Sequence, residues 1–492
     1  MARHKIRFLR RGRPVEVVPA SPTETLLDYI RLREGSLGTK EGCNEGDCGA
    51  CTVALGRLKG GRLAYEPVNA CIHLLGMADG AEIVTVEDLA EGDRLHPVQA
   101  AMVEHHGAQC GFCTPGIVMS LFALHHEDAA PGRAEICDRL AGNLCRCTGY
   151  RPIVDAALAS CTGRSADGFA ERAAATAGIL AAWGDDEDVF VGDEERFFAA
   201  PGTLAGLLAL LDRHPEATIV AGATDVGLWV TKQLRDLPKI VWLGRVAALK
   251  EIAETPAGLV VGAGATYAEV EPFAARLDPD LGQLWRRIGS RQVRAAGTVG
   301  GNVANGSPIG DMPPALIALG ATVELRRGEA ERSLALEDFF LGYGRQDRAS
   351  GELVTRLVVP RPAENEVFRA YKIAKRFDQD ISAVMMAVKL TIDDGRVASA
   401  RLAFGGMAAT PKRASATEAA LGGLALADEA GAERAAAALA EDFSPIGDMR
   451  ASAEYRLDVA RGLVLKAFAE AGGAPTVTTR VMGFREAALA DE

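Results

Sequence analysis

No stretch of this chain approaches the about 20 consecutive apolar residues that a membrane-spanning helix needs. The longest candidate, residues 173–183, is too short and contains Thr176. An excess of positive charge is also missing, since 54 basic residues stand against 66 acidic ones and the formal net charge is −12. Because phosphate binding needs a basic face, this balance argues against a general nucleic-acid binder. We therefore expect neither a membrane nor a nucleic acid among the partners.

The first 16 residues are basic but lack the apolar core of a secretory signal. Apolar and polar residues alternate on both sides of Gly12, which predicts a β-hairpin here and a cytoplasmic protein. Cysteine is absent from the last two thirds of the chain, because all ten cysteines lie between Cys43 and Cys161. In a cytoplasmic protein such a concentration favours metal ligands and buried thiols over disulfides.

Changes in composition and the positions of turn-forming residues divide the 492 residues into four folded pieces and one linker. Residues 1–92 predict short strands with one helix, and residues 93–165 predict helices. Residues 166–193 are rich in small and acidic residues and predict a linker. Residues 194–362 alternate between strand-like and helix-like runs, and residues 366–485 begin with a hairpin and continue with helices. The expected fold class is a multidomain α+β protein.

The first group of cysteines predicts a 2Fe–2S cluster. Three of them follow the spacing C-x4-C-x2-C of plant-type clusters, and a fourth lies downstream. Glycines between them allow the unusual dihedral angles and the close approach that wrapping a cluster requires. Zinc sites usually have paired short spacings, so zinc or free thiols are the weaker alternative. The expected ligands are Cys43, Cys48, Cys51 and Cys71.

The second group combines a C-x2-C pair with a C-x-C pair. By itself this spacing leaves a zinc site open as an alternative. Each pair adjoins the end of an expected helix, where helix N-terminal N–H groups can face cluster sulfurs. The expected ligands are Cys110, Cys113, Cys145 and Cys147. The two remaining cysteines, Cys137 and Cys161, are expected to be small buried hydrophobes.

No G-x-G-x-x-G follows a strand and begins a helix, so a Rossmann nucleotide site is not supported. Two other glycine-rich segments are present. Residues 219–227 follow a strand and begin a helix, a turn that can present free N–H groups to a pyrophosphate. Residues 297–311 contain five glycines and predict a long loop whose backbone can approach a large ligand closely. For each segment alone, a tight turn between elements is the alternative.

Two sequence blocks carry a resemblance to a known family. QCGFCTPG at residues 109–116 and GNLCRCTGYR at residues 142–151 resemble the second 2Fe–2S domain of the molybdenum hydroxylases. The two glycine-rich segments resemble the FAD-binding segments of that family, and residues 339–343 and 448–456 are also similar to it. The resemblance spans residues 5–485 apart from the linker. The order of the pieces is similar to that of the small, iron–sulfur and flavin subunits of bacterial xanthine dehydrogenases.

This resemblance implies a plant-ferredoxin-like β-grasp domain and a four-helix 2Fe–2S domain. An α+β FAD-binding domain of the PCMH/VAO-like type and a C-terminal α+β domain of the CO-dehydrogenase-flavoprotein type follow. It also implies that the first glycine-rich segment holds the FAD pyrophosphate and that the second surrounds the cofactor. The expected FAD-binding residues are Val220, Ala221, Gly222, Ala223, Thr224, Asp225, Val226, Gly297, Thr298, Gly300, Gly301, Asn302, Asn305, Ser307, Asp311 and Lys375.

The function implied by the resemblance is electron transfer in an NAD-dependent oxidoreductase. A molybdopterin-binding large subunit oxidises hypoxanthine or xanthine to urate, and this chain passes the electrons through two 2Fe–2S clusters to FAD and then to NAD+. The two subunits would form a heterodimer that pairs into a heterotetramer. Tyr343 and Asp380 are the expected residues on the NAD side. The chain departs from the family at Gly344, where many members have the arginine that here follows as Arg345.

The reducing substrate is not determined by this chain, because substrate choice lies in the partner subunit. A related hydroxylase acting on an aldehyde or an N-heterocycle such as nicotinate is therefore one alternative. A diaphorase-like electron carrier that docks with varied partners is a second. A third alternative is a scaffold protein that is stabilised by structural zinc and has no redox chemistry. The final acceptor, NAD+ or oxygen, and the oligomeric state are also left open by the sequence.

Overall fold

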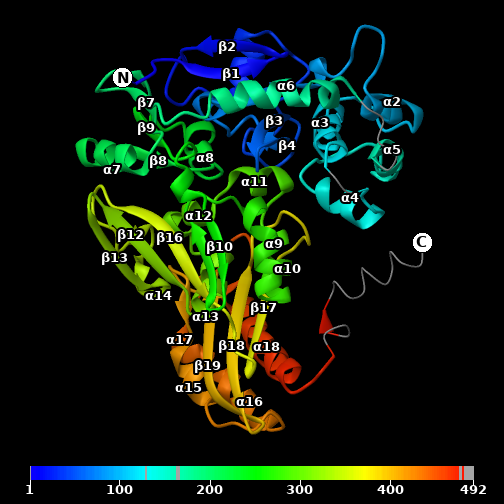
Figure 1. Cartoon of the computed structure of the whole chain (residues 1–492). Helices are drawn as coiled ribbons and strands as arrows, with labels where there is room; N and C mark the ends of the chain where they lie inside the picture. Colours follow the sequence, from blue (N-terminus) through cyan, green and yellow to red (C-terminus); the bar gives the residue numbers. More distant parts are fainter. Residues whose placement is uncertain (1, 128–129, 162–166, 476–478, 481–492) are drawn as a thin grey trace. The chain divides into compact units, whose positions relative to one another are not determined.

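The computed structural model of the chain describes residues 2–127, 130–161, 167–475 and 479–480. The chain divides into two compact units, which are described separately below (Figure 1). Unit 1 comprises Met1–Ala248, Thr266–Ala268 and Gly289–Thr298, and unit 2 comprises Leu249–Ala265, Glu269–Ile288 and Val299–Glu492. No helix in the described ranges is long and apolar enough to cross a membrane.

Unit 1 begins with a five-stranded sheet in the order β2-β1-β5-β3-β4. The predicted hairpin is confirmed, because Ile6 pairs with Val17 and Gly12 lies between the strands with a φ of 69°. Only β1 and β5 pair in parallel, as in a β-grasp domain. The elements are β1 (Ile6–Arg10), β2 (Arg13–Val17), α1 (Leu26–Asp28) with a π-helical turn (Tyr29–Arg33), β3 (Thr52–Lys59), β4 (Arg62–Asn69), β5 (Glu82–Val84), and the 3-10 turns Leu75–Ala78 and Val86–Asp88.

Four helices follow, as the resemblance implied: α2 (Pro97–Glu104), α3 (Thr114–His125), α4 (Arg133–Arg139) and α5 (Arg151–Cys161). Proline lies in the first turn of both α2 and α3, where its missing N–H group costs no helical hydrogen bond. Apolar residues of α3, such as Ile117 and Phe122, are fully buried at the centre of this group.

The expected linker is wrong for most of its length, because residues 168–182 form a regular helix, α6 (Gly168–Ala182). Asp167 caps it by accepting a hydrogen bond from the backbone N–H of Ala170 at 2.7 Å. Only Phe169, Thr176 and Leu180 of this alanine-rich helix are buried, so the sequence shows little apolar periodicity. The ring of Phe169 packs edge-on against Phe122 of α3. The segment is therefore packed structure, and residues 162–166 lie outside the described residues.

The remainder of unit 1 contains a four-stranded sheet in the order β6-β7-β9-β8. Strands β7, β9 and β8 are parallel, and β6 is antiparallel to β7. The strands are β6 (Val189–Gly192), β7 (Phe197–Ala200), β8 (Thr218–Val220) and β9 (Lys239–Trp242), and the helices are α7 (Leu204–Arg213), α8 (Val226–Thr231) and α11 (Arg291–Ala296). Side chains of this sheet and of the β-grasp sheet share one hydrophobic core.

Unit 2 contains an antiparallel five-stranded sheet in the order β10-β11-β16-β12-β13. The strands are β10 (Ile252–Thr255), β11 (Gly258–Gly262), β12 (Thr322–Arg327), β13 (Ala330–Ala335) and β16 (Leu353–Pro360). The helices are α9 (Tyr267–Leu277), α10 (Pro279–Arg286), α12 (Val299–Asn305), α13 (Met312–Leu319) and α14 (Leu336–Phe339); a 3-10 turn (Ala247–Leu249) and a small hairpin, β14 (Phe340–Gly342) with β15 (Arg345–Gln346), complete this part.

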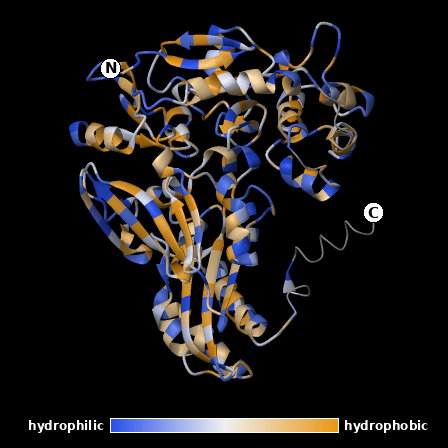
Figure 2. Ribbon diagram, viewed as in Figure 1, coloured by the Kyte–Doolittle hydropathy of each residue, from blue (hydrophilic) through white to orange (hydrophobic). Residues whose placement is uncertain are grey.

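The last part of unit 2 is an antiparallel sheet in the order β17-β18-β19-β20, with the predicted hairpin turning at Asp394-Gly395. Residues 384–388 of β18 are all buried, so both faces of the strand are covered, and the strand is hydrophobic in Figure 2. Both α13 and α18 contact it. The elements are β17 (Glu366–Ile373), β18 (Val384–Asp393), β19 (Arg396–Gly405), β20 (Lys412–Arg413), α15 (Ser415–Leu421), α16 (Glu429–Ala437), α17 (Leu439–Asp442) and α18 (Ala453–Ala471). Of the expected domain 366–485, residues 481–485 lie outside the described residues.

Candidate functional site

The first four predicted ligands lie together in unit 1. The Cys43 sulfur is in hydrogen-bond contact with the thiols of Cys48 and Cys71, and Cys71 also contacts Cys51. The backbone N–H groups of Asp47 and Cys48 donate to the Cys43 sulfur at 3.4 and 3.3 Å. The Cys48 thiol first, then the Cys71 thiol and these N–H groups, hold the pKa of the Cys43 thiol well below its usual range. The same contacts with Cys43 raise the pKa of the Cys48 and Cys71 thiols, so it is the gathering of four sulfurs beside backbone N–H donors that fits a 2Fe–2S cluster.

The backbone of this loop explains two of its glycines. Gly46 and Gly49 have φ values of 77° and 69°, in the left-handed region that glycine adopts at little cost. A Cβ atom on Gly49 would lie 2.1 Å from the carbonyl oxygen of Gly142, in the segment that leads into the second cysteine pair. Gly49 is thus required both by its own dihedral angle and by the contact between the two cysteine-bearing segments.

The second four predicted ligands also lie together in unit 1. Cys113 contacts Cys145, and Cys110 contacts Cys147. Cys113 immediately precedes α3, as expected for a cysteine whose cluster faces a helix N-terminus. Although burial alone would raise it, the pKa of the Cys145 thiol is lowered by hydrogen bonds from Thr148, whose hydroxyl lies 3.2 Å from the sulfur. Burial raises the pKa of the Cys113 thiol and the contact with Cys110 raises that of Cys147, so the fit to a cluster rests on the four gathered sulfurs.

Of the two cysteines that were not assigned to a cluster, Cys161 is buried as predicted and Cys137 is only partly so. Cys161 is 1% exposed at the end of α5, within the hydrophobic core of the helical part. Cys137 is half-buried and packs against the same core.

The first glycine-rich segment and the start of the second meet in unit 1, although about 75 residues separate them. The segment 220–226 connects β8 to α8, and Ala223 has a φ of 57°, which is uncommon for a residue with a side chain. A Cβ atom on Gly222 would lie 2.0 Å from the carbonyl oxygen of Ala296 and 2.8 Å from Cα of Gly297. This close approach places the N-terminal turn of α8 beside residue 297, which suits the binding of a pyrophosphate.

The expectation of one long loop at residues 297–311 is wrong, because residues 299–305 form helix α12. A Cβ atom on Gly300 would lie 2.3 Å from Cβ of Ala263, so close packing of α12 accounts for this glycine. Asn302 presents a buried side-chain oxygen that has no hydrogen-bond partner within the described ranges. Gly301 is exposed, and Asn305 and Ser307 are half-buried. The Asn305 carbonyl accepts from Gln346 and the Ser307 hydroxyl accepts from the Ile309 N–H, so the Asn302 oxygen is the group here that a ligand could satisfy.

Asp311 is buried in unit 2, and both of its carboxylate oxygens have protein partners. One forms an ion pair with the ammonium group of Lys372, whose side chain is only 3% exposed, and the other accepts the hydroxyl of Ser382 at 2.5 Å. Neither partner was singled out from the sequence. A contact between Asp311 and a cofactor hydroxyl stays a prediction.

The residues expected near the flavin and NAD lie in two loops of unit 2. Tyr343 is 76% exposed in the turn between β14 and β15, and Gly344 completes that turn with a φ of 64°. Lys375 donates to the carbonyl oxygen of Met449 at 2.9 Å. Burial opposes ionisation of Asp380, but the N–H groups of Arg376 and Ile381 outweigh it and lower the pKa of this carboxyl group. Asp380 thus stabilises its own loop.

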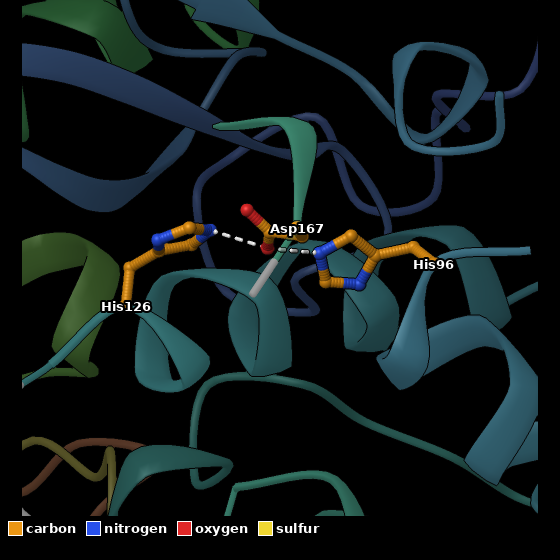
Figure 3. A group of neighbouring side chains, drawn as sticks. All are labelled: His96, His126 and Asp167. Atoms are coloured by element: carbon orange, nitrogen blue, oxygen red, sulfur yellow. Dashed lines mark hydrogen bonds and ion pairs between the residues drawn. The ribbon is translucent and has the colours of Figure 1, made fainter. Parts of the chain in front are cut away.

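A cluster of histidines around one aspartate was missed by sequence reasoning. His96, His126 and Asp167 converge in unit 1 (Figure 3), with distances of 2.7 and 3.1 Å from the two Nε2 atoms to Asp167 Oδ2. Their ligand atoms are close enough together to suggest a metal site. However, His96 Nδ1 accepts the backbone N–H of Val98 at 3.2 Å, so Nε2 carries the proton and donates it to Asp167. A protonated nitrogen cannot bind a metal, so we interpret the cluster as a hydrogen-bonded link between α2, α3 and α6.

We expect the variant Asp167→Asn to destabilise the packing of α6 by about 1.5–3 kcal/mol, because an amide nitrogen cannot accept the histidine N–H groups. Burial would raise the pKa of Asp167, but hydrogen bonds from His126 and His96 lower it far more. A lowered folded-state pKa means that the stabilisation is complete above about pH 4 and is lost on acidification below it. Hydrogen exchange of α6 at pH 7 measures the effect. Asp155→Asn, at a half-exposed ion pair with Arg133, is the control and should change exchange little. Equal effects of the two variants would contradict the interpretation.

Comparison with known families accounts for most of the chain. A 2Fe-2S iron-sulfur cluster binding domain matches residues 9–75, and a second 2Fe-2S binding domain matches residues 85–158. The FAD binding domain in molybdopterin dehydrogenase matches residues 194–362, and the CO dehydrogenase flavoprotein C-terminal domain matches residues 369–471. The chain belongs to the molybdenum hydroxylase family. The eight gathered cysteines lie within the two cluster-binding matches, and both glycine-rich segments lie within the FAD-binding match.

Similar proteins in this family act on different substrates. A xanthine dehydrogenase from Blastobotrys adeninivorans is 32% identical over 82% of this chain and 36% of its own length. A nicotinate hydroxylase from Emericella nidulans is 30% identical over 94% of this chain and 40% of its own length. A reconstituted CO dehydrogenase from Oligotropha carboxidovorans matches 54% of this chain and 94% of the solved chain with 30% identity and a TM-score of 0.52. The chain spans little more than a third of the length of the xanthine dehydrogenase and of the nicotinate hydroxylase.

Proposed function

We propose that this chain is the iron–sulfur and flavin subunit of a bacterial-type xanthine dehydrogenase. It receives electrons from a molybdopterin-binding large subunit that oxidises hypoxanthine and xanthine to urate, and it delivers them to NAD+. The observation that carries the proposal is the presence of two complete sets of four gathered cysteines in unit 1, followed by an FAD-binding domain in the same chain. The similarity to xanthine dehydrogenases over most of the chain supports the choice of substrate.

The residues present fit the proposed cofactors. Four thiols for each cluster lie in contact, and the backbone from residue 220 to 226, beside Gly297 and Thr298, suits the FAD pyrophosphate. When bound, the clusters carry single electrons and FAD collects a pair that can leave as a hydride. Tyr343 and Asp380 remain the proposed residues on the NAD side. The proposed location is the cytoplasm, and the proposed assembly is a heterodimer paired into a heterotetramer.

A related substrate is the second candidate. It is supported by the nicotinate hydroxylase, which matches 94% of this chain, while a xanthine dehydrogenase from the same organism matches 93%. Co-purification of the chain with its molybdopterin-binding partner, followed by assays with xanthine, nicotinate and an aldehyde, separates these possibilities. A diaphorase-like carrier would co-purify with no such partner and would turn over none of the three.

The purified chain alone should contain about four irons, four sulfides and one FAD, because its eight ligands form two sets of four. It should transfer electrons from NADH to an artificial dye acceptor but should not oxidise xanthine, since the molybdenum centre is proposed to lie on the partner. Iron and sulfide analysis, flavin release and the two activity assays measure this. A colourless zinc protein, or xanthine turnover at the rate of NADH oxidation, would contradict the proposal.

A further inference from the structure

Four buried polar side chains form one hydrogen-bonded network within unit 1, although they come from distant parts of the sequence. Each has a position next to a candidate cofactor segment. Thr52 follows the ligand Cys51, and Ser120 lies in α3, which begins after the ligand Cys113. Asn143 precedes the ligand Cys145 by two residues, and Gln292 lies in α11, directly before the flavin segment at residue 297. None of the four is more than 5% exposed.

Gln292 is the centre of this network. Its amide nitrogen lies 3.2 Å from the hydroxyl oxygens of Thr52 and Ser120 and 2.9 Å from the side-chain oxygen of Asn143. Ser120 donates to the same Asn143 oxygen at 2.6 Å. The Asn143 amide nitrogen donates to the carbonyl oxygen of Gly49 at 3.1 Å and to Thr52 at 3.2 Å. One glutamine thus joins both cysteine-bearing segments to the helix before the flavin segment.

Glycines allow the backbones around this network to touch directly. A Cβ atom on Gly142 would lie 2.1 Å from the Gln292 side-chain oxygen, and one on Gly116 would lie 2.1 Å from the carbonyl oxygen of Gly49. The N–H group of Leu144 donates to the carbonyl oxygen of Cys48 at 3.0 Å. The two cysteine-bearing segments are therefore in backbone contact, and small relative shifts would break several buried hydrogen bonds together.

We propose that Gln292 is a positioning residue that sets the separation of the two clusters and of the first cluster from the flavin. The proposal rests on the proposed function in that it takes both cysteine groups to carry clusters. Buried amide and hydroxyl groups are costly to leave unpaired, so the network favours a single arrangement of the segments that it joins. The rate of electron transfer falls steeply with the distance between cofactors. A fixed arrangement of the segments therefore keeps that rate high.

The test uses the full-length chain and the variant Gln292→Met, which keeps the length of the side chain and removes its amide. We expect normal iron and FAD contents with faster hydrogen exchange at the Leu144 N–H group. The magnetic interaction between the two reduced clusters, read by EPR, should change. Electron transfer within the chain after flash photoreduction should slow severalfold, since the rate of electron transfer falls exponentially with the distance between the cofactors. The control is Gln233→Met, at an exposed glutamine of unit 1, which should change none of these readouts.

Wild-type exchange, EPR interaction and transfer rate in Gln292→Met would overturn the proposal. If that variant loses iron, Ser120→Ala, which removes a hydroxyl that accepts from Gln292 and donates to Asn143, should shift the exchange and the EPR interaction in the same direction. Unchanged values would overturn the proposal equally. Flash photoreduction needs neither NAD nor a purine, so failure of the wild-type chain to oxidise NADH would count against the proposed function alone. Hydrogen exchange at Leu144 tests the role of Gln292 whatever the electron acceptor is.

Discussion

Replacing Cys71 by serine is expected to leave the chain with about two irons instead of about four, since each 2Fe–2S cluster contains two. Cys71 is 1% exposed, and its sulfur contacts those of Cys43 and Cys51, so it completes the first ligand set from within the core. A serine hydroxyl is a harder and far less acidic ligand than a thiol and does not replace a thiolate at iron. One EPR signal should disappear, and the signal of the Cys110, Cys113, Cys145 and Cys147 group should remain.

The matched control is Cys161→Ser, because Cys161 is equally buried and belongs to the same unit but is not among the eight candidate ligands, and its thiol donates to the carbonyl oxygen of Leu121. It should keep about four irons and two EPR signals while losing some stability. Iron analysis of the two variants side by side decides the outcome. Full iron in Cys71→Ser, or equal loss in both, would show that the fourth ligand is assigned wrongly.

The variant Asp311→Ala is expected to destabilise unit 2 by about 3–5 kcal/mol, because it leaves the ammonium group of Lys372 buried without its counter-charge. FAD should become substoichiometric, because Asp311 is the last residue of the segment 297–311, which is proposed to bind the cofactor. Iron should be retained, since all eight candidate ligands lie in unit 1. Thermal unfolding, flavin content and iron content measure the three effects.

The double variant Asp311→Leu with Lys372→Met separates the structural role of Asp311 from a role toward the cofactor. Replacing both charges by apolar groups should recover most of the lost stability, since a buried ion pair can be exchanged for hydrophobic packing at little net cost. If FAD content recovers as well, Asp311 acts only through its ion pair. If stability recovers and FAD remains low, Asp311 accepts a hydrogen bond from the cofactor, a contact worth about ten- to a hundredfold in affinity.

The two ligand sets could be predicted from the sequence because metal chemistry limits the spacing of ligands strongly. A chain must bring three sulfurs to one cluster within a few residues, so C-x4-C-x2-C leaves a recognisable pattern around Cys43, Cys48 and Cys51. The hairpins at Gly12 and at Asp394-Gly395 were predictable for a similar reason, since turn chemistry and alternation are local. Helix α6 was missed because its alanines bury so few large side chains that the apolar period is weak.

The sequence by itself predicted the order of the domains, the eight candidate sulfur ligands and the two segments that suit FAD, because each of these depends on residues close together in the chain. Only the tertiary structure decided which polar groups hold them in place. Gln292 reaches Thr52 across 240 positions, His96 reaches Asp167 across 71, and Lys372 reaches Asp311 across 61. Such contacts leave no periodic pattern in the sequence. A single glutamine, histidine or lysine looks the same in the sequence whether its side chain is exposed or buried and paired. Their pairing is favoured by burial, because a buried polar group is costly to leave unpaired.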